Sequence, residues 1–369
     1  MLKRIIIISI SVISLIGFFL CLGVSASIRT TFRSQLVSDV WRGQSGERFA
    51  QLSAFFPESS VFNEESVLRL RHELNNSLRN SSIEATGGRK LHTDAWSANV
   101  DVTLISEHET NPVSAKAIAV GGDFFLFHPL KLRDGSYLSP NDVMKDRIVI
   151  DEELAWRLFG AIRLAGFEVL INDKIFIVAG VVSRENDFAS SIAYTYGAGL
   201  FMSFEAYSEL YEGNASISTY EIVMPDPITG FALSEFTDVL AYPSAIIIEN
   251  SARFSLGKIF EILGSFGERS MQRDPIAFPY WENAARFAED RLALLLVFTI
   301  ILIIFPVVCA VIYTVILVKF GVRQLIKYIK KQIDIRDKKH YEQYKLDHGD
   351  KPQIYSVDDI LRDAQDEIY

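Results

Sequence analysis

Two long apolar runs stand near opposite ends of the chain, Ile5–Val24 and Leu292–Val318, and neither contains a charged residue. A helix needs about 20 apolar residues to cross a hydrocarbon core about 30 Å thick, and both runs reach that length. The segment between the runs has the mixed composition of a globular domain. The pattern therefore predicts transmembrane helices over 5–26 and 291–318 that bracket a domain over 27–290.

Helical patterns recur within the predicted domain. Asn63 is a favourable helix cap, the two glutamates that follow it suit a first turn, and apolar residues then recur at helical spacing up to Leu78. We expect the first apolar helix to continue out of the membrane through 27–54 and to end at Pro57. Further helices are predicted over 152–159, 203–211, 231–240, 255–266 and 281–291.

Runs rich in β-branched and aromatic residues, bounded by turn residues, predict strands between these helices. The predicted strands are 100–105, 115–120, 147–151, 167–171, 174–182, 220–225 and 245–249. Asn172 and Asp173 separate two of them, and such a pair suits the tight turn of a hairpin. Strands that alternate with short helices favour an α+β domain over a sandwich. The expected fold class is an α+β extracytoplasmic domain, in two parts, between two transmembrane helices.

The basic residues around the apolar runs predict the topology. They stand on both sides of the first run, so that end alone is ambiguous, whereas 319–331 after the second run is strongly basic and is expected in the cytoplasm. Two spans put both termini on one side, with 1–4 as a cytoplasmic N-terminus and the domain outside a bacterial cell membrane. A signal peptide cleaved near Ala26 is the alternative for the first run, but the run is longer than the usual apolar core of about 7–15 residues.

Two further segments follow the second run. The first, 319–333, predicts a basic amphipathic helix beside the membrane. Its basic residues are candidates for contact with membrane lipid or a cytoplasmic partner: Arg323, Lys327, Lys330 and Lys331. The second segment, 334–369, is a polar cytoplasmic tail.

The tail divides into a polar tether over 334–352 and a short acidic helix. Ser356 begins a capping-box pattern, and Ile360 and Leu361 then fall at helical spacing. The helix has the form of a docking peptide, so Ile360 and Leu361 are candidate partner contacts. A frayed surface tail is an equally good interpretation, because isolated helices this short are marginal in water.

Composition narrows the possible functions. The net charge of −9 argues against nucleic-acid binding, which uses clustered positive charge. Cys21 and Cys309 both lie inside the apolar runs, so the domain must be held by its own core rather than by disulfides. Neither run carries an Asp, Glu, Lys, Arg or His residue, which argues against a pore or proton relay formed by this chain alone. Ser9, Ser11 and Ser14 are able to hydrogen-bond to a neighbouring helix.

The sequence contains none of four common catalytic or cofactor-binding motifs. It lacks a P-loop, a glycine-rich dinucleotide fingerprint, the His-Glu-x-x-His zinc motif and the Gly-x-Ser-x-Gly nucleophile elbow. The densest group of metal-ligand types is Glu107-His108-Glu109, where His108 would point away from both glutamates in a strand. We therefore expect no enzyme, no metal and no cofactor. An envelope hydrolase is an interpretation with no motif behind it.

Three consecutive segments of the domain resemble one known family. Ala119–Gly135 leads from a strand to a turn that ends in glycine, Asp146–Gly160 is a strand and helix ending in Leu-Phe-Gly, and Gly166–Val182 is a closing hairpin. In order and spacing they resemble the extracytoplasmic core domain of MacB/FtsX-type ABC transporter permeases. The closest match covers 117–182, and the anchor–domain–anchor layout agrees more loosely.

The resemblance implies a mechanical role. In such permeases a cytoplasmic ATPase drives the membrane helices, and the outer domain handles peptides, lipoproteins or toxic compounds, or activates an envelope enzyme. Family members carry four spans and this sequence carries two, so we expect a non-catalytic permease-like or accessory subunit whose partners are an ABC ATPase, a fuller permease subunit, or both. The alternative is a membrane-anchored binding or sensory module that signals through its cytoplasmic tail.

Overall fold

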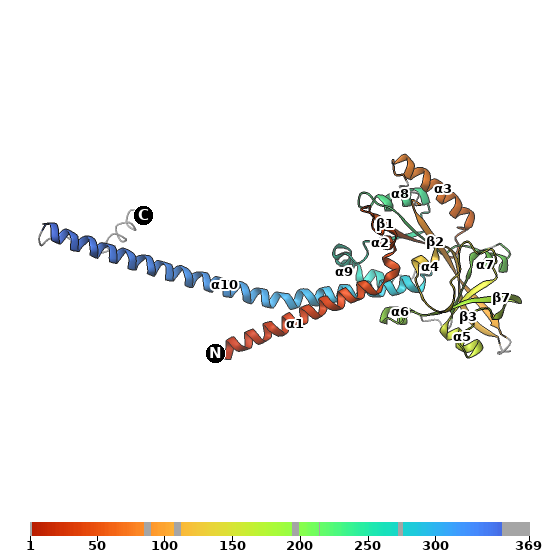
Figure 1. Cartoon of the computed structure of the whole chain (residues 1–369), viewed down its shortest axis with the longest axis horizontal. Coiled ribbons are helices and arrows are strands. Elements are labelled where there is room, and N and C mark those ends of the chain that lie inside the picture. The colour runs from red at the N-terminus through yellow and green to blue at the C-terminus, as the bar shows by residue number, and fades with distance from the viewer. Residues whose placement is uncertain are drawn as a thin grey trace. The chain divides into compact units, whose positions relative to one another are not determined.

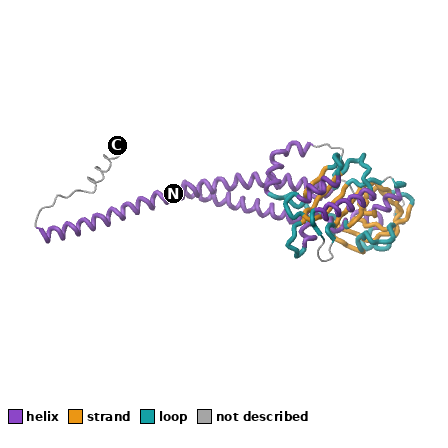
Figure 2. Tube along the Cα trace, turned by 90° about the horizontal axis from the view of Figure 1, so that it is seen from above, coloured by secondary structure: helices purple, strands orange, loops and turns teal. Residues whose placement is uncertain are grey.

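The computed structural model describes residues 2–84, 90–106, 112–193, 199–213, 215–271 and 276–348. The chain divides into two compact units. The head unit is Phe19–Thr299, and the terminal unit comprises Met1–Phe18 and Ile300–Tyr369. The described strands all belong to the head unit, and the described part of the terminal unit is helical (Figure 2).

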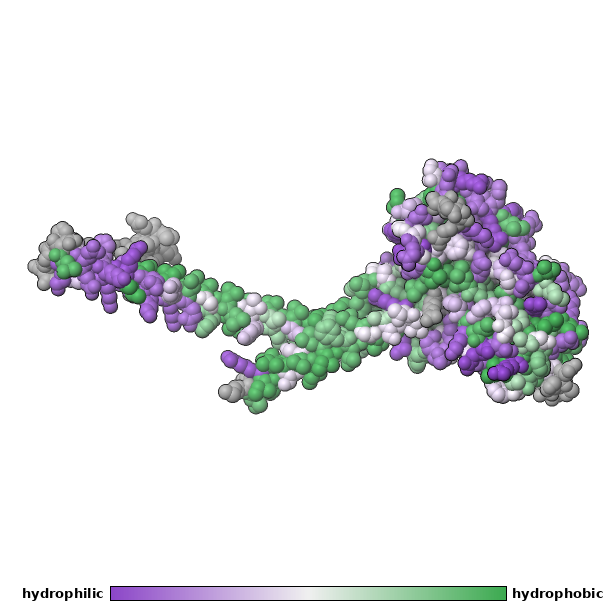
Figure 3. Space-filling model, in the orientation of Figure 1, coloured by the Kyte–Doolittle hydropathy of each residue, from purple (hydrophilic) through white to green (hydrophobic). Residues whose placement is uncertain are grey.

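Two helices are long and apolar enough to cross a membrane, over Arg4–Thr31 and Tyr280–Leu346. They belong to α1 (Leu2–Thr31) and α10 (Tyr280–His348). Hydrophobic side chains cover the part of α10 that carries the second apolar run, and hydrophilic ones cover the part beyond it (Figure 3). The two predicted apolar helices are therefore present in the fold.

The helix α10 is longer than the sequence pattern indicated. It continues through Pro306 and the predicted basic helix up to His348. The polar tether predicted over 334–352 is helical over 334–348. This stretch is rich in Lys, Arg, Glu and Gln, which favour helix, and the first glycine follows only at Gly349.

The two helices contact each other within the terminal unit. The Ser14 hydroxyl donates a hydrogen bond of 2.6 Å to the Leu302 carbonyl oxygen. A side-chain carbon at Gly17 would lie 3.2 Å from the Leu302 side chain, so glycine permits the close approach. Of the serines predicted to bond another helix, Ser14 does so, whereas Ser11 donates to Ile7 of its own helix.

The predicted helix over 27–54 is wrong beyond Thr31. The chain instead forms the short helices η1 (Arg33–Gln35) and α2 (Val37–Arg42), followed by a strand, β1 (Phe49–Phe55). The buried Gln51 side chain holds this arrangement, accepting a hydrogen bond from the Val37 amide and donating one to the Ser34 carbonyl. β1 is a central strand with neighbours on both sides, and this long-range pairing outweighs local pattern.

The head unit is built on one mixed sheet, whose order is β10-β1-β9-β2-β3-β8-β5-β7-β4, with β6 paired to β2 and β7 (Figure 1). The strands after β1 are β2 (Thr93–Ile105), β3 (Val113–Gly122), β4 (Lys131–Gly135), β5 (Arg147–Asp151), β6 (Glu168–Ile171), β7 (Lys174–Ser183), β8 (Gly199–Ser203), β9 (Thr219–Pro225) and β10 (Ile246–Glu249). The predicted α+β class and most predicted strands are confirmed.

Six of these strands pair in a closed ring, in the order β2-β3-β8-β5-β7-β6 and back to β2. The β6–β7 hairpin closes it, through pairs such as Leu104 with Ile171. Asn172 and Asp173 both have positive φ, 47° and 65°, as the predicted tight turn requires. The ring places the hydrophobic side chains of distant segments in one core, including Ile148 and Leu200.

The remaining helices are short. They are α3 (Glu64–Asn80), α4 (Phe124–Phe127), α5 (Glu152–Phe159), α6 (Phe188–Ala193), α7 (Phe204–Leu210), α8 (Phe231–Leu240) and α9 (Leu256–Met271). α3 and α8 pack together over one face of the sheet, with Leu74 and Phe236 in the same core cluster. The opposite face carries a second cluster that includes Phe124, Phe201 and Trp281. The predicted cap is confirmed, since Asn63 accepts the Ser66 amide at 3.0 Å.

Candidate functional site

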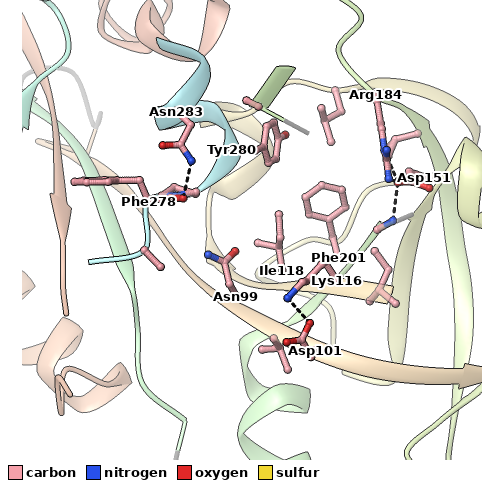
Figure 4. Close-up of a pocket in the computed structure, with 18 of the residues that line it drawn as sticks. Asn99, Asp101, Lys116, Ile118, Asp151, Arg184, Phe201, Phe278, Tyr280 and Asn283 are labelled. Atoms are coloured by element: carbon pink, nitrogen blue, oxygen red, sulfur yellow. Dashed lines mark hydrogen bonds and ion pairs between the residues drawn. The ribbon is translucent and has the colours of Figure 1, made fainter. Parts of the chain in front are cut away.

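A cavity of about 520 Å³ opens on the sheet face that carries Phe201 (Figure 4). One wall comes from the strands of the ring, and the other comes from residues 276–283, which comprise the segment before α10 and the first turn of α10. We call residues 276–283 the lid. The principal lining residues are Asn99, Asp101, Lys116, Ile118, Asp151, Arg184, Phe201, Phe278, Tyr280 and Asn283.

The floor of the cavity follows from strand register. Asn99 of β2 lies opposite Ile118 of β3, which lies beside Phe201 of β8, so these side chains share one face of the sheet. In the next row Asp101 lies opposite Lys116, with 2.6 Å between Oδ1 and Nζ. Both partners are largely exposed, so this ion pair adds little stability. The floor therefore offers an apolar patch with a polar edge.

Asp151 is the buried acid at the far edge of the cavity. It caps α5 by accepting the Leu154 amide at 2.7 Å, accepts the Gly199 amide at 2.7 Å, and pairs with Arg184 at 2.6 Å. Burial raises the pKa of Asp151, although Arg184 and the two amides oppose that shift. With its oxygens committed to these partners, Asp151 acts as a structural anchor for β5, β8 and Arg184.

The lid is packed against the head unit by Phe278. Its ring meets Phe55 of β1 edge to face, with centroids 5.1 Å apart, and the Arg286 guanidinium lies 3.7 Å above the ring centroid. The Asn283 amide donates a 3.1 Å hydrogen bond to the Phe278 carbonyl. The lid and the first turn of α10 thus form one connected piece (Figure 4).

A buried ion-pair cluster fixes the start of α10 to the head unit. Arg253 donates two hydrogen bonds to Glu282, at 2.6 and 2.7 Å, and one to Glu289 at 2.5 Å. All three side chains are buried, and Arg286 adds a bond to Glu282 at 2.7 Å. Burial lowers the pKa of Arg253, but the two carboxylates outweigh it and hold the pKa above its ordinary value. We call Arg253, Glu282 and Glu289 the stem clamp.

Trp281, beside the clamp, anchors α10 to the sheet. Its ring lies 4.2 Å from that of His128, and the buried His128 Nε2 lies 2.5 Å from Glu221 Oε2 on β9. Ser53 of β1 donates to the other oxygen of Glu221 at 3.1 Å. The start of α10 is therefore in contact with the stem clamp and, through Trp281 and His128, with Glu221 of β9.

The basic residues predicted from sequence lie on one face of α10, at helical spacing, and are exposed: Arg323, Lys327, Lys330 and Lys331. They belong to the terminal unit, and the cavity belongs to the head unit. Ile360, Leu361 and the group Glu107-His108-Glu109 lie outside the described residues. Among the described residues, no group of three His, Cys, Asp or Glu side chains is placed to hold a metal ion.

Sequence reasoning missed the lid and the clamp. In the sequence Glu289 is only part of an acidic flank of the second apolar run, and Arg253 belongs to no pattern. The clamp joins residues 29 and 36 positions apart in the chain. The one available signal was Glu282 and Glu289 on the same face of a predicted helix, where unpaired acids beside an apolar run require a basic partner.

Comparison with known proteins identifies the family. The family model for the MacB-like periplasmic core domain matches residues 5–235. Among solved structures, the periplasmic region of MacB from Actinobacillus actinomycetemcomitans is 14% identical, with a TM-score of 0.41 over 60% of this chain and 94% of that chain. The extracellular domain of the noncanonic ABC-type transporter YknZ from Gram-positive bacteria is 14% identical, with a TM-score of 0.36 over 54% of this chain and 99% of that one. No curated protein matches the sequence.

The chain belongs to the family of the MacB-like periplasmic core domain, found in ABC-transporter-type proteins. The resemblance to MacB/FtsX-type permeases drawn from residues 117–182 is thereby confirmed. It is a membrane protein of this class with a mixed α/β extracytoplasmic domain and two candidate membrane-spanning helices.

Proposed function

We propose that this chain is a non-catalytic, permease-like subunit of a MacB-type ABC complex that transmits movement between a cytoplasmic ATPase and the extracytoplasmic cavity. The observation that carries the proposal is the continuity of the lid with α10. One helix contributes the first turn behind the lid and also the second apolar run. A rocking movement of that helix would be passed through Phe278 to β1 and would change the shape of the cavity.

The stem clamp supports this role because it resists slippage. A helix held only by apolar contacts can slide, whereas a bidentate guanidinium–carboxylate pair fixes direction and distance. In the proposed topology both termini are cytoplasmic, 27–290 is extracytoplasmic, and the basic residues 319–331 flank the membrane on the ATPase side. The ligand handled by the cavity is one with apolar surface and a polar end, to match Ile118 and Phe201 beside the Asp101–Lys116 edge.

The first test is partner recovery. The full chain, affinity-purified from its native membrane in mild detergent, is expected to bring down an ABC ATPase or a fuller permease subunit, identified by mass spectrometry. Recovery of neither would overturn the proposal. A variant lacking 334–369 separates it from the sensory alternative, since a sensor that signals through its tail would lose output while keeping its assembly.

The second test fixes the lid. Asn99→Cys and Asn283→Cys, in a chain with both native cysteines replaced by alanine, place one thiol on the floor and one at the start of α10 for a short bis-maleimide linker. Asn99→Cys with Asp101→Cys puts both thiols on the floor and is the matched control. We expect the floor–lid link alone to abolish stimulation of the partner ATPase. Equal activity of both linked proteins would show that lid movement is not required.

A further inference from the structure

The helix α9 has an apolar surface that the head unit leaves uncovered. Ile259 and Ile262 are buried against Leu292 and Ala293 of α10, and Ile28 of α1 packs on the same cluster. Leu256 and Phe260 lie next to this buried edge on the helix and are 58% and 53% exposed. The apolar face of α9 is therefore wider than the part of it that packs against α1 and α10.

The polar side of α9 points away from that apolar face. Lys258 and Glu261 form an ion pair of 3.0 Å and line a groove with β10. A helix of this kind, with an apolar face, a charged face and moderate length, is typical of segments that lie in a membrane–water interface. The feature alone does not decide between a lipid and a protein partner.

The position of α9 along the axis of α10 favours lipid over protein as its partner. Leu292 is the first residue of the second apolar run, and Leu294, two residues on, is 56% exposed although it belongs to that run. A rise of about 1.5 Å per residue puts Leu294 only about 3 Å further along the helix than Leu292. The exposed side chains of α9 thus lie level with the point where α10 begins to face lipid.

The short helix α6 also packs one face on α10 and leaves an apolar side chain exposed beside that contact. α6 packs Ala189 against Ala284 and Ala288 of α10, while Phe188 is 59% exposed and lies under the Arg291 guanidinium, 4.5 Å from its ring centroid. Arg291 immediately precedes the apolar run. An exposed aromatic ring paired with a cation at this position suits the headgroup layer, which is about 5–8 Å deep on each side of the hydrocarbon core. Figure 1 places α6 and α9 at the start of α10.

We propose that α9 lies in the outer membrane–water interface, with Leu256 and Phe260 inserted among the lipid chains. The head unit then rests on the bilayer through α9 in addition to the two spanning helices. This contact belongs to the head unit itself and is independent of any ATPase or permease partner.

Spin labelling of the full chain tests the proposal. Single cysteines at Leu256, Phe260, Glu261 and Leu294, in a chain with Cys21 and Cys309 replaced by alanine, carry a nitroxide after reconstitution into phosphatidylcholine–phosphatidylglycerol vesicles. Collisions with oxygen report lipid, and collisions with a nickel chelate report water. We expect oxygen to dominate at 256 and 260, as at the lipid reference 294, and the chelate to dominate at 261.

Val143→Cys, at a side chain that is 94% exposed, is the water reference. Because every labelled side chain on α9 is exposed, the variants are expected to unfold at the temperature of the cysteine-free parent. Dominance of the chelate at 256 and 260 would overturn the proposal. Protection from both reagents at these positions would also overturn it, since it would indicate burial against protein.

Discussion

Replacement of Arg253 by methionine removes the centre of the stem clamp. Methionine matches the length of the arginine stem but withdraws the Arg253 guanidinium from the buried Glu282 and Glu289. Arg286 still reaches Glu282, so Glu289 loses the guanidinium that Arg253 supplies. The change should therefore weaken the attachment of α10 and lower the stability of the whole head unit.

Breaking a buried ion pair by removing one partner costs about 3–5 kcal/mol. In a unit of this size about 1 kcal/mol lowers the unfolding temperature by roughly 2–4 °C, so Arg253→Met should lower it by about 6–20 °C. The matched control is Arg42→Met, because Arg42 and its partner Asp39 are both largely exposed. An exposed pair contributes about 0–1 kcal/mol, and its loss should shift the unfolding temperature by less than about 4 °C.

Thermal unfolding followed by circular dichroism in detergent micelles measures both variants. A third variant, Arg253→Met with Glu282→Gln and Glu289→Gln, also removes the two carboxylate charges and should recover much of the loss, since replacing a whole buried cluster is far less costly than breaking it. Equal shifts for Arg253→Met and Arg42→Met would refute the reasoning. Failure of the triple variant to recover any stability would show that packing, and not unpaired charge, causes the loss.

Three further predictions follow from other parts of the fold. Gly135 and Gly166 both have positive φ, so alanine at either position should cost about 1–2 kcal/mol in backbone strain. Gly135→Ala should cost about 1–3 kcal/mol more, because its new Cβ would lie 2.0 Å from the Ala179 carbonyl oxygen, whereas Gly166 has open space; equal unfolding temperatures would contradict this. Burial and the nearby Asp187 raise the pKa of Glu185, so the stability that depends on its protonated form is present at low pH and is lost as the pH rises through the raised pKa. Glu185→Gln should therefore unfold at a higher temperature than the parent at pH 7, with the difference vanishing below pH 4; a difference independent of pH would contradict the assignment. A peptide of residues 319–345 should bind anionic vesicles in a cosedimentation assay through its four predicted contacts, Arg323, Lys327, Lys330 and Lys331. Replacing each of these residues by glutamine should weaken the binding free energy by about 1 kcal/mol, and unchanged binding would exclude a lipid role.

Local signals predicted the local parts of this fold. The helix predicted over 231–240 has those bounds, Asn63 caps its helix, and the Asn172-Asp173 turn closes its hairpin, because each depends on residues close together in the chain. The helix predicted over 49–55 was wrong because the apolar and small polar residues of this segment fit helix and strand alike. Only pairing with β9 and β10 decides between the two. The closed ring could not be predicted either, since it depends on the long-range pairing of β6 with β2.

The candidate site could not be predicted because its parts are brought together by tertiary structure alone. Asn99, Ile118 and Phe201 become neighbours only through strand register, and the lid reaches them only after α10 has docked. The three pieces of sequence that identified the family all lie in the ring. They therefore indicated the class of protein without indicating which residues face the cavity.

The position of the clamp on α10 sets how movement can be transmitted. Glu282 and Glu289 are seven residues apart, about 10 Å along one face of the helix, and Arg253 binds both. The α10 residues packed between them are small, Ala284, Ala285 and Ala288, and such a smooth surface alone would allow the helix to slide or rotate. Because Arg253 holds two points that lie two turns apart, it fixes the register of α10 against the head unit. The loop that carries Arg253 is bound to β1 by two hydrogen bonds from Asn250. Its backbone amide donates to the Gln51 carbonyl, and its side-chain amide donates to the Ser53 hydroxyl. A movement of α10 would therefore carry β1 and the edge of the sheet with it, while the floor of the cavity lies on β2, β3 and β8, separated from β1 by β9. In the proposed function, the lid and the β1 edge of the sheet would move together relative to the cavity floor, which carries none of the clamp residues.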